Sequence, residues 1–409
     1  MKQVVMAPIG LRARVKQKLA KLRFYPLFAQ ERLRMAVKRL PENKKKILFV
    51  LDYDRLYRDA DNMGRYAFFI MNIFSESGYA VFFYKKVDFK FYISMGRYGR
   101  DIYRIKNLKI VERFPENPSD TIFAFDNEVI GFKILEKEWK RRVYINVLKD
   151  GAWKFEPCSW IPYAMHFLVY KNGAHLKLDR YRKSTKKMRI FFGGNTAPAY
   201  YNNPLLMSHY GQLSRLMALN IITGSEAVNK RYIKKADELL KRISDGQPDN
   251  SITLFESGGS GLDPSRWLDV VSSADFFLCL SGTDYPMCHN AIEAMAVGAI
   301  PLLSYADWFF PPLEHGENAL IFHGKDDLVK TIESALQMSV ADITRMRAKV
   351  IEYYEKHLSF QSFIKKFEST EEKLSTLALH PRYVCTDADK KENPQANFEE
   401  LASNLGKLR

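Results

Sequence analysis

The chain has 409 residues, of which 46% are hydrophobic and 13% aromatic, so it can build two α/β domains and cannot be largely disordered. Its formal net charge is +16, but residues 1–46 hold 14 Lys or Arg and only two Glu, which leaves the remainder nearly neutral and argues against a broad nucleic-acid surface. The longest apolar runs have about nine residues, well short of the roughly 18–20 that span a bilayer. With no signal-peptide pattern and four cysteines without metal-like spacing, we expect a protein of the reducing cytosol.

The basic N-terminal segment, residues 1–43, carries apolar residues at helical spacing between its Lys and Arg side chains: Leu11, Val15, Leu19, Leu22, Leu33, Val37 and Leu40. We expect Pro26 to interrupt this helix. A basic amphipathic helix is typical of segments that lie on an anionic membrane surface. A helix packed on the body and an RNA-binding arm are the alternatives. Under the membrane interpretation, removal of the segment should leave a folded protein.

The first domain is expected over residues 44–185, and it opens like a Rossmann unit. An apolar strand at Ile47–Asp54 leads through a polar loop to a helix at Met63–Ser77 and a strand at Tyr79–Tyr84. Further strands are expected at Leu108–Phe114, Thr121–Phe125 and Val143–Leu148. Residues 85–106 fit no pattern, and the polar stretch Leu176–Lys187 reads as the connection between domains.

The second domain is expected over residues 186–358 and alternates strands with helices, which predicts a parallel sheet. Its strands are expected at Arg189–Asn195, Ile221–Gly224, Ile252–Glu256 and Asp275–Leu280, and its helices at Pro204–Asn220, Glu226–Ser244 and Pro264–Ser273. Gly193-Gly194-Asn195 ends the first of these strands, where glycines let the backbone approach a diphosphate. The pattern is helical from Asp326 to Leu377, and residues 359–409 are expected to form terminal helices and a tail.

The most informative stretch is Asp284–Ser304, which reads as a turn, a helix and a strand. Pro286 suits a first helical turn, and Gly298 suits the end of the helix. His289 and Glu293 are four residues apart and share a helix face, and Asn290 lies beside them. Polar residues at a helix start, just beyond the carboxyl end of a parallel strand, are where such sheets bind nucleotides. The helix start favours a diphosphate, and a carboxylate further along can accept hydrogen bonds from ribose hydroxyls.

The sequence EAMAVGAIPLL, with NALIF downstream at Asn318–Phe322, resembles the C-terminal signature of GT-B glycosyltransferases. Asp284, Glu293 and the run from Gly298 to Leu302 also resemble the exostosin-type pattern. The resemblance covers roughly Arg189–Phe322, and the N-terminal half resembles the family by layout. Two positions depart from it. Tyr285 stands where many retaining members have a second Glu, and Asn290 where exostosin-like members have Arg, so the stereochemistry of transfer stays open.

The resemblance implies two Rossmann-like domains that face a cleft, with C-terminal helices that cross back to the first domain. It also implies a nucleotide-sugar donor held by Gly193, Gly194, Asn195, Asp284, His289, Asn290 and Glu293. Members of this family usually need no bound metal, so no metal or further cofactor is expected. Asp52-Tyr53-Asp54 could be a metal-binding DxD motif. We reject that interpretation because the motif follows the first strand and would leave the second Rossmann unit unexplained.

Inverting transfer needs a base that takes the proton of the acceptor hydroxyl. Candidates on loops of the first domain are Asp52, Asp54, Asp126, Asp150 and His166. Asp150 follows a strong strand and precedes Gly151, while His166 lies among aromatic residues.

The sequence therefore predicts a glycosyltransferase that moves a hexosyl or related sugar to a glycan or polyprenyl-linked acceptor, as in cell-surface polysaccharide biosynthesis. We expect it at the cytoplasmic face of the membrane, bound peripherally through residues 1–43, with no nucleic-acid partner. The alternatives are a nucleotide-sugar 2-epimerase and a noncatalytic adaptor that binds membrane or glycan.

Overall fold

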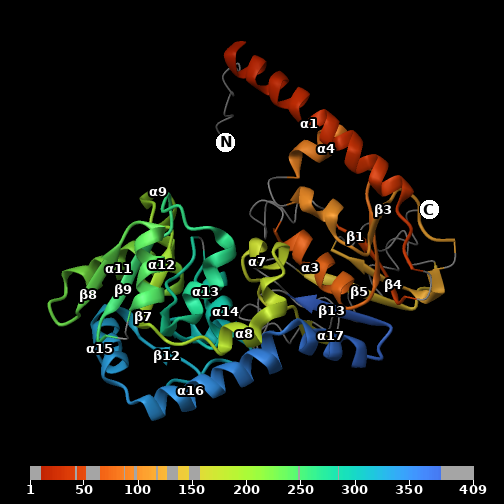
Figure 1. The fold of residues 1–409 in the computed structure, drawn as a ribbon. Helices are drawn as coiled ribbons and strands as arrows, with labels where there is room; N and C mark the ends of the chain where they lie inside the picture. Colours follow the sequence, from red (N-terminus) through yellow and green to blue (C-terminus); the bar gives the residue numbers. More distant parts are fainter. Residues whose placement is uncertain are drawn as a thin grey trace.

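The computed structural model describes residues 11–41, 44–51, 65–86, 88–95, 99–116, 118–126, 137–146, 157–246, 249–283 and 285–378, with side chains from residue 24 onward. The chain forms two lobes, each built on a parallel β-sheet, with α7 (Phe167–Lys171) between them (Figure 1). The predicted fold class, α/β with two Rossmann-like domains, is confirmed.

The sheet of the first lobe has seven strands in the order β3-β2-β1-β4-β5-β13-β6, and all its paired strands are parallel. They are β1 (Lys46–Val50), β2 (Ala80–Tyr84), β3 (Leu108–Val111), β4 (Thr121–Phe125), β5 (Arg141–Asn146), β6 (Cys158–Trp160) and β13 (Leu374–Ala378). Both faces of this sheet are covered, as parallel sheets require. Phe49 packs on Phe74 of α3 (Arg65–Glu76), and Phe123 of the opposite face stacks on Trp139.

Strand β13 is the main correction to the first lobe. The sequence predicted helix up to Leu377, but the last helix ends at Ser369 and β13 lies between β5 and β6. Thr376 is in register with Tyr144 on one side and Cys158 on the other. A short apolar run can form a strand or a buried helix, and here the two neighbouring strand edges decide.

Helix α1 (Leu11–Val37) is continuous through Pro26, so the predicted interruption is wrong. Its second half packs on α4 (Phe89–Ser94), where Phe28 lies between Phe89 and Tyr92 at ring distances of 5.5 and 5.3 Å. The unplaced residues 85–106 thus supply α4 and the 3-10 helix η1 (Arg100–Arg104). Deleting residues 1–43 would uncover this aromatic contact, which counts against the expectation that the segment is dispensable for folding; that expectation stays a prediction.

The sheet of the second lobe has six parallel strands in the order β12-β11-β10-β7-β9-β8. They are β7 (Met188–Gly194), β8 (Lys230–Ile233), β9 (Ile252–Glu256), β10 (Ala274–Leu278), β11 (Ile300–Leu303) and β12 (Leu320–Ile321). Its helices include α9 (Pro198–Tyr201), α10 (Leu205–Tyr210), α11 (Arg215–Gly224), α12 (Ala236–Asp245), α13 (Trp267–Ser272) and α14 (His289–Ala296).

Three predictions in this lobe are wrong. Ile221–Gly224 ends helix α11 and is not a strand, and the true strand β8 lies inside the predicted helix Glu226–Ser244. The predicted helix Pro204–Asn220 is broken, because Gly211 ends α10 in the left-handed conformation and the Ser214 side chain then caps α11. Ala218, Leu219 and Ile222 of α11 are buried, so packing overrides the β-branched character of Ile221-Ile222.

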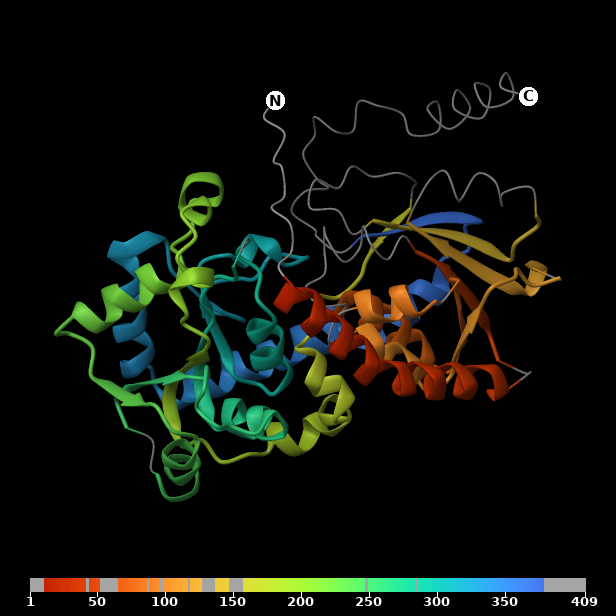
Figure 2. The same ribbon diagram turned by 90° about the horizontal axis from the view of Figure 1, so that it is seen from above.

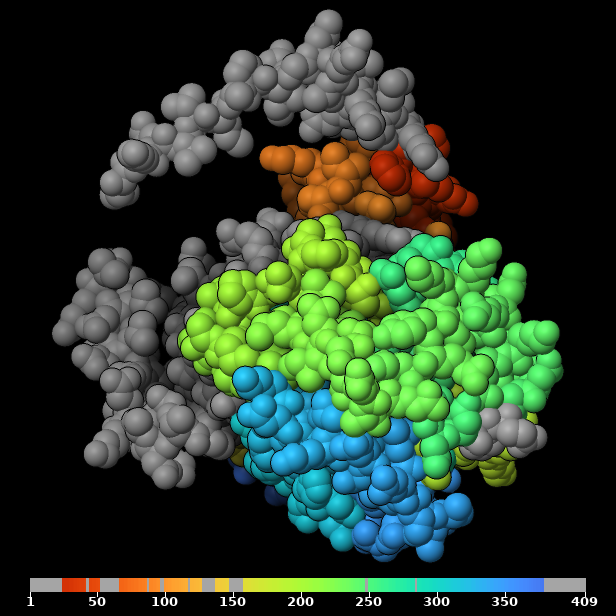
Figure 3. Space-filling view, turned by 90° about the vertical axis from the view of Figure 1, so that its left-hand side faces the viewer, coloured from red at the N-terminus to blue at the C-terminus, as the bar shows by residue number. Residues whose placement is uncertain are grey.

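The C-terminal helices cross back to the first lobe, as predicted. They are α15 (Gly324–Gln337), α16 (Val340–Tyr353), the π-helical turn η6 (Tyr354–Leu358) and α17 (Phe360–Ser369). Helix α16 runs along the second lobe and α17 lies under the first (Figure 1), where Phe367 packs on Phe74 at 5.0 Å. Seen from the side of the second lobe, α15 and α16 form the lower part of its surface (Figure 3). The proposed boundary at residue 186 falls between α8 (Leu178–Arg182) and β7.

Candidate functional site

A cavity of about 330 Å³ opens where α7 faces the carboxyl ends of β7 and β9 and the start of α14. Six of the seven predicted donor residues line it, together with His166: Gly193, Gly194, Asn195, His289, Asn290 and Glu293. Asp284, Asp54 and Asp150 lie outside the described residues. The structure thus brings the described candidates together, and their roles remain predictions.

At the end of β7, Gly193 is required by its surroundings and Gly194 has little room for a side chain. A Cβ atom on Gly193 would lie 2.7 Å from the rings of both Phe191 and Trp267, and one on Gly194 would lie 3.1 Å from the guanidinium of Arg215. Asn290 holds this strand end to α14, because its side-chain amide donates to the carbonyl oxygen of Gly193 at 3.1 Å. Bare backbone is therefore presented to the cavity, as phosphate sites on parallel sheets need.

Helix α14 is packed into the lobe over almost its whole length. Its residues from Asn290 to Ala296 are buried, and small alanines let it lie close to its neighbours. It starts at His289, three residues after Pro286, and Gly298 ends it with φ of 75° before β11 begins. The helix start faces the cavity through His289 and Asn290.

The carboxylate of Glu293 joins three elements. Glu293 is fully buried, with 0% of its surface exposed. Its Oε1 accepts a hydrogen bond from the backbone N–H of His166 at 2.7 Å, and its Oε2 accepts one from the indole N–H of Trp267 at 2.6 Å. A buried carboxylate is tolerated only when donors replace water, and here they come from α7 and α13. Each oxygen has a second lone pair, so a ribose contact would add to these bonds.

His166 is the N-cap residue of α7. Its Nδ1 accepts the backbone N–H of Leu168 at 3.3 Å, and its ring lies 5.3 Å from the ring of His289. In the neutral ring this bond leaves the proton on Nε2, so that atom donates. The capping bond counts against His166 as the base and suits a donor to an oxygen of the substrate. Asp126 is buried after β4 and does not line this cavity.

Sequence reasoning missed Arg215, which begins α11 and lines the cavity at 3% exposure. Its guanidinium donates to the carbonyl oxygens of Asn195 at 2.8 Å and Ser281 at 3.2 Å, and stacks on Tyr201 at 3.9 Å. The guanidinium also donates to Cys288 Sγ at 3.6 Å, and within the described part of the chain its Nε has no hydrogen-bond partner and no carboxylate pairs with it. The sequence analysis placed Arg215 in the middle of one long predicted helix. Gly211, which ends α10, and Ser214, which caps α11, were the signals that could have shown a helix start at Arg215.

The loop after β9 closes the cavity on another side. Ser257, Leu262, Pro264 and Trp267 line it, and the backbone N–H of Ser257 bonds the carbonyl oxygen of Gly194 at 3.0 Å. The loop begins with the sequence SGGSG (residues 257–261), in which Gly259 and Gly261 have φ of 73° and 80°. The loop therefore supplies an apolar wall opposite the polar helix start.

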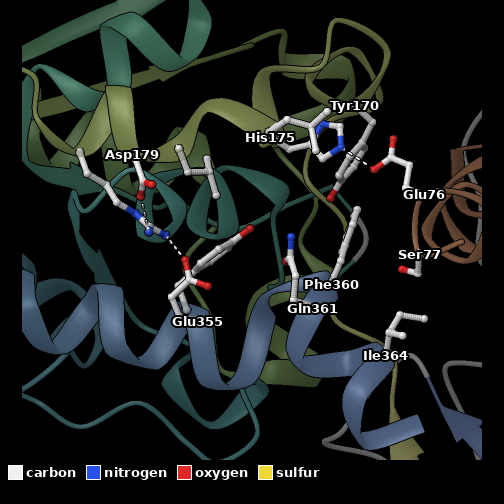
Figure 4. A pocket seen from close by; sticks show the side chains of 13 residues that line it. Glu76, Ser77, Tyr170, His175, Asp179, Glu355, Phe360, Gln361 and Ile364 are labelled. Atoms are coloured by element: carbon white, nitrogen blue, oxygen red, sulfur yellow. Dashed lines mark hydrogen bonds and ion pairs between the residues drawn. The ribbon is translucent and has the colours of Figure 1, made fainter. Parts of the chain in front are cut away.

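A second cavity, of about 460 Å³, lies on the other side of α7 (Figure 4). His175 pairs with Glu76 at 2.7 Å across it, and Arg182 pairs with Glu355. It is larger than the first cavity but lies away from the glycines of β7 and the start of α14, so it is not the nucleotide candidate.

Within the described residues, no three His, Cys, Asp or Glu side chains are grouped to hold a metal ion. The Asp52-Tyr53-Asp54 motif lies outside them. No helix in the part of the chain that the structure describes is both long and apolar enough to cross a membrane.

No protein-family model matches the chain, and no curated protein matches its sequence, so the exostosin-type resemblance stays a prediction. Among solved structures, the chain is similar to HepE of Anabaena in complex with UDP and glucose, at 11% identity over 79% of this chain and 98% of that one, with a TM-score of 0.39. It is also similar to the E. coli trehalose-6-phosphate structure bound with UDP-2-fluoro glucose, at 11% identity over 79% and 98% of the chains, with a TM-score of 0.41. TarM follows at 12% identity over 65% and 59%, with a TM-score of 0.31. At these values the function must be argued from the chain's own site.

Proposed function

We propose that the protein is a glycosyltransferase that binds a nucleotide-sugar donor in the 330 Å³ cavity and transfers the sugar to an acceptor held by the first lobe. The observation that carries the proposal is Arg215, a buried cation that faces the cavity beside two side-chain-free backbone positions and a helix start. Among the residues that the structure describes, this guanidinium has no carboxylate partner, and a buried guanidinium matches phosphate oxygens well.

The rest of the cavity suits the other parts of a nucleotide. The backbone of Gly193 and Gly194 and the start of α14 would take the diphosphate together with Arg215. Glu293 would accept a ribose hydroxyl, and Leu262, Pro264 and Trp267 would flank the base. Pockets for small ligands have roughly 300–1,000 Å³, so the volume fits.

In the transfer step, the acceptor oxygen forms a bond to the anomeric carbon while the bond from that carbon to the diphosphate breaks. Arg215 and the start of α14 would stabilise the negative charge that develops on the leaving diphosphate. In an inverting reaction the acceptor proton would pass to a base on the first lobe, for which Asp150 and Asp54 remain candidates alongside His166. The proposed acceptor is a glycan or polyprenyl-linked sugar of surface polysaccharide assembly at the cytoplasmic membrane face, with an anionic membrane as partner.

The test is a thermal-shift screen of the full chain against nucleoside diphosphates and their sugars, headed by UDP and UDP-glucose. A ligand at a hundred times its Kd stabilises the folded protein by about 2.7 kcal/mol, which is readily measured. Arg215→Met should lose most of this shift, whereas Arg231→Met, which removes an exposed guanidinium on β8, should keep it. Absence of any nucleotide effect on the wild type would overturn the proposal in favour of the adaptor. Isomerisation of the donor sugar without an acceptor would favour the epimerase.

A further inference from the structure

Helix α1 has two apolar faces, and the first lobe uses only one of them. Phe28 and Met35 are buried on the inner face, where Phe28 meets the rings of α4. Leu33 and Val37 lie on the opposite face and are 66% and 70% exposed. Pro26 and Ala29 precede Leu33 on the same helix face, at steps of three and four residues, and they are exposed as well. Packing on the body therefore explains one face of the helix and leaves the other unexplained.

In the sequence, the series to which these exposed residues belong has a regular spacing along the whole helix. The positions 11, 15, 19, 22, 26, 29, 33 and 37 follow one another at steps of three or four residues, which is the repeat of one helix face. Because α1 is continuous through Pro26, this phase is kept from its first residue to its last. All eight positions of the series are Leu, Val, Ala or Pro, so the sequence defines one apolar stripe, called the outer stripe below. At about 1.5 Å per residue, the 27-residue helix is roughly 40 Å long.

The charge of α1 indicates what the outer stripe meets. The helix contains eight Lys or Arg and one Glu. The carboxylate of this residue, Glu31, forms an ion pair with the guanidinium of Arg104 on the first lobe at 3.7 Å. Two copies of so basic a helix would repel each other, which disfavours self-association through the stripe. A nucleic acid would match the charge but not the exposed Leu33 and Val37. An anionic lipid surface matches both, because apolar side chains enter the boundary of the acyl chains while cations stay at the headgroups.

We propose that the outer stripe of α1 docks the protein on an anionic lipid membrane, while the inner face fixes the helix rigidly to the first lobe. Figures 1 and 2 show α1 along the outer side of that lobe, so docking would lay the proposed acceptor lobe on the membrane. The attachment is thus a built part of the fold rather than a separable tail. The inference deepens the membrane partnership of the proposed function, and it rests on the packing and charge of α1 and not on the nucleotide cavity.

The test is co-sedimentation of the full chain with phosphatidylcholine vesicles, with and without phosphatidylglycerol. Binding should require phosphatidylglycerol and weaken as salt rises, because screening shortens the reach of the attraction to about 10 Å at 0.1 M. The double variant Leu33→Glu with Val37→Glu should bind at least tenfold more weakly. The matched control, Val340→Glu, changes an equally exposed apolar residue at the start of α16 and should bind like the wild type.

Unchanged vesicle binding by the double variant would overturn the proposal, and so would equal binding to both kinds of vesicle. Two further results would assign the stripe to another partner and overturn the proposal: binding to RNA without binding to vesicles, or a wild-type dimer that dissociates in the double variant. Circular dichroism should show both variants folded, since each substituted residue is exposed. Since the nucleotide screen uses no lipid and this assay no nucleotide, either proposal can fail without the other.

Discussion

Helices α14 and α1 show two ways in which this chain holds a helix. Helix α14 is enclosed, with seven consecutive buried residues and polar side chains tied to named partners in β7, α7 and α13. Helix α1 touches the body along one face, through Phe28 and Met35, and exposes the other. In α14 the side chains of Asn290 and Glu293 are held by hydrogen bonds to neighbouring elements, which is what a binding site requires. In α1 the described residues of the outer face, such as Leu33 and Val37, are exposed and can serve a surface.

The comparison predicts that substitutions in α14 cost stability at every position, whereas those in α1 cost stability on one face. Three tests probe this difference, and the largest effect is expected at the carboxylate of α14.

Glu293→Ala should destabilise the protein by about 3–5 kcal/mol, because it leaves the N–H groups of His166 and Trp267 buried without their acceptor. Urea unfolding measures this, with Glu226→Ala, an exposed carboxylate of the same lobe, as the control within about 0.5 kcal/mol of wild type. Donor affinity should also fall about tenfold. A variant as stable as the wild type would show that the carboxylate does not join α14 to α7 and α13.

Phe28→Ala should cost about 3 kcal/mol, since it removes a buried ring from the contact with Phe89 and Tyr92. Leu33→Ala, on the exposed face of the same helix, should change the unfolding free energy by less than about 0.5 kcal/mol. The pair is measured by the same denaturant titration. Equal costs for the two residues, whether both large or both small, would contradict the two-faced packing of α1.

A smaller effect should appear in the pH dependence of stability. Burial, with Arg347 nearby, lowers the pKa of Lys186 to about 7, and its ammonium donates to the carbonyl oxygen of Ser272. Below pH 7 Lys186 is charged in both states and the cost of burying it is fully present. Between pH 7 and its ordinary pKa of 10.5 only the unfolded chain holds the proton, so stability should rise with pH by at most about 1.4 kcal/mol per unit.

Lys186→Met should flatten this rise, which thermal unfolding across pH 6–10 would show. Lys38, at the end of α1, is a weaker counterpart, because its pKa is lowered only to about 8 and its side chain is half-buried. Lys38→Met should therefore change the pH profile less. If Lys38→Met changed the pH dependence of stability more than Lys186→Met does, the end of α1 would be more deeply buried than its half-buried Lys38 indicates.

The part of the candidate site that lies in one stretch of sequence could be predicted. Strand β10, helix α14 and strand β11 follow one another, with Gly298 as the stop and His289, Asn290 and Glu293 at fixed helical spacing. The strand into Gly193 and Gly194 was equally clear, and parallel-sheet geometry then brings both segments to one edge. These patterns are local, so the sequence alone determined the two-domain fold and the position of the cavity.

What depends on distant contacts was decided by the tertiary structure. Residues Leu374–Ala378 become a strand because β5 and β6 leave an open position between them, and Ile221 stays helical because α11 buries the neighbouring face. Arg215 faces the cavity because the chain turns between Gly211, which ends α10, and Ser214, which caps α11. The outer face of α1 is the one that α4 does not cover. In each case the local pattern allowed two conformations or two faces, and the free energy of packing against a remote segment selected one.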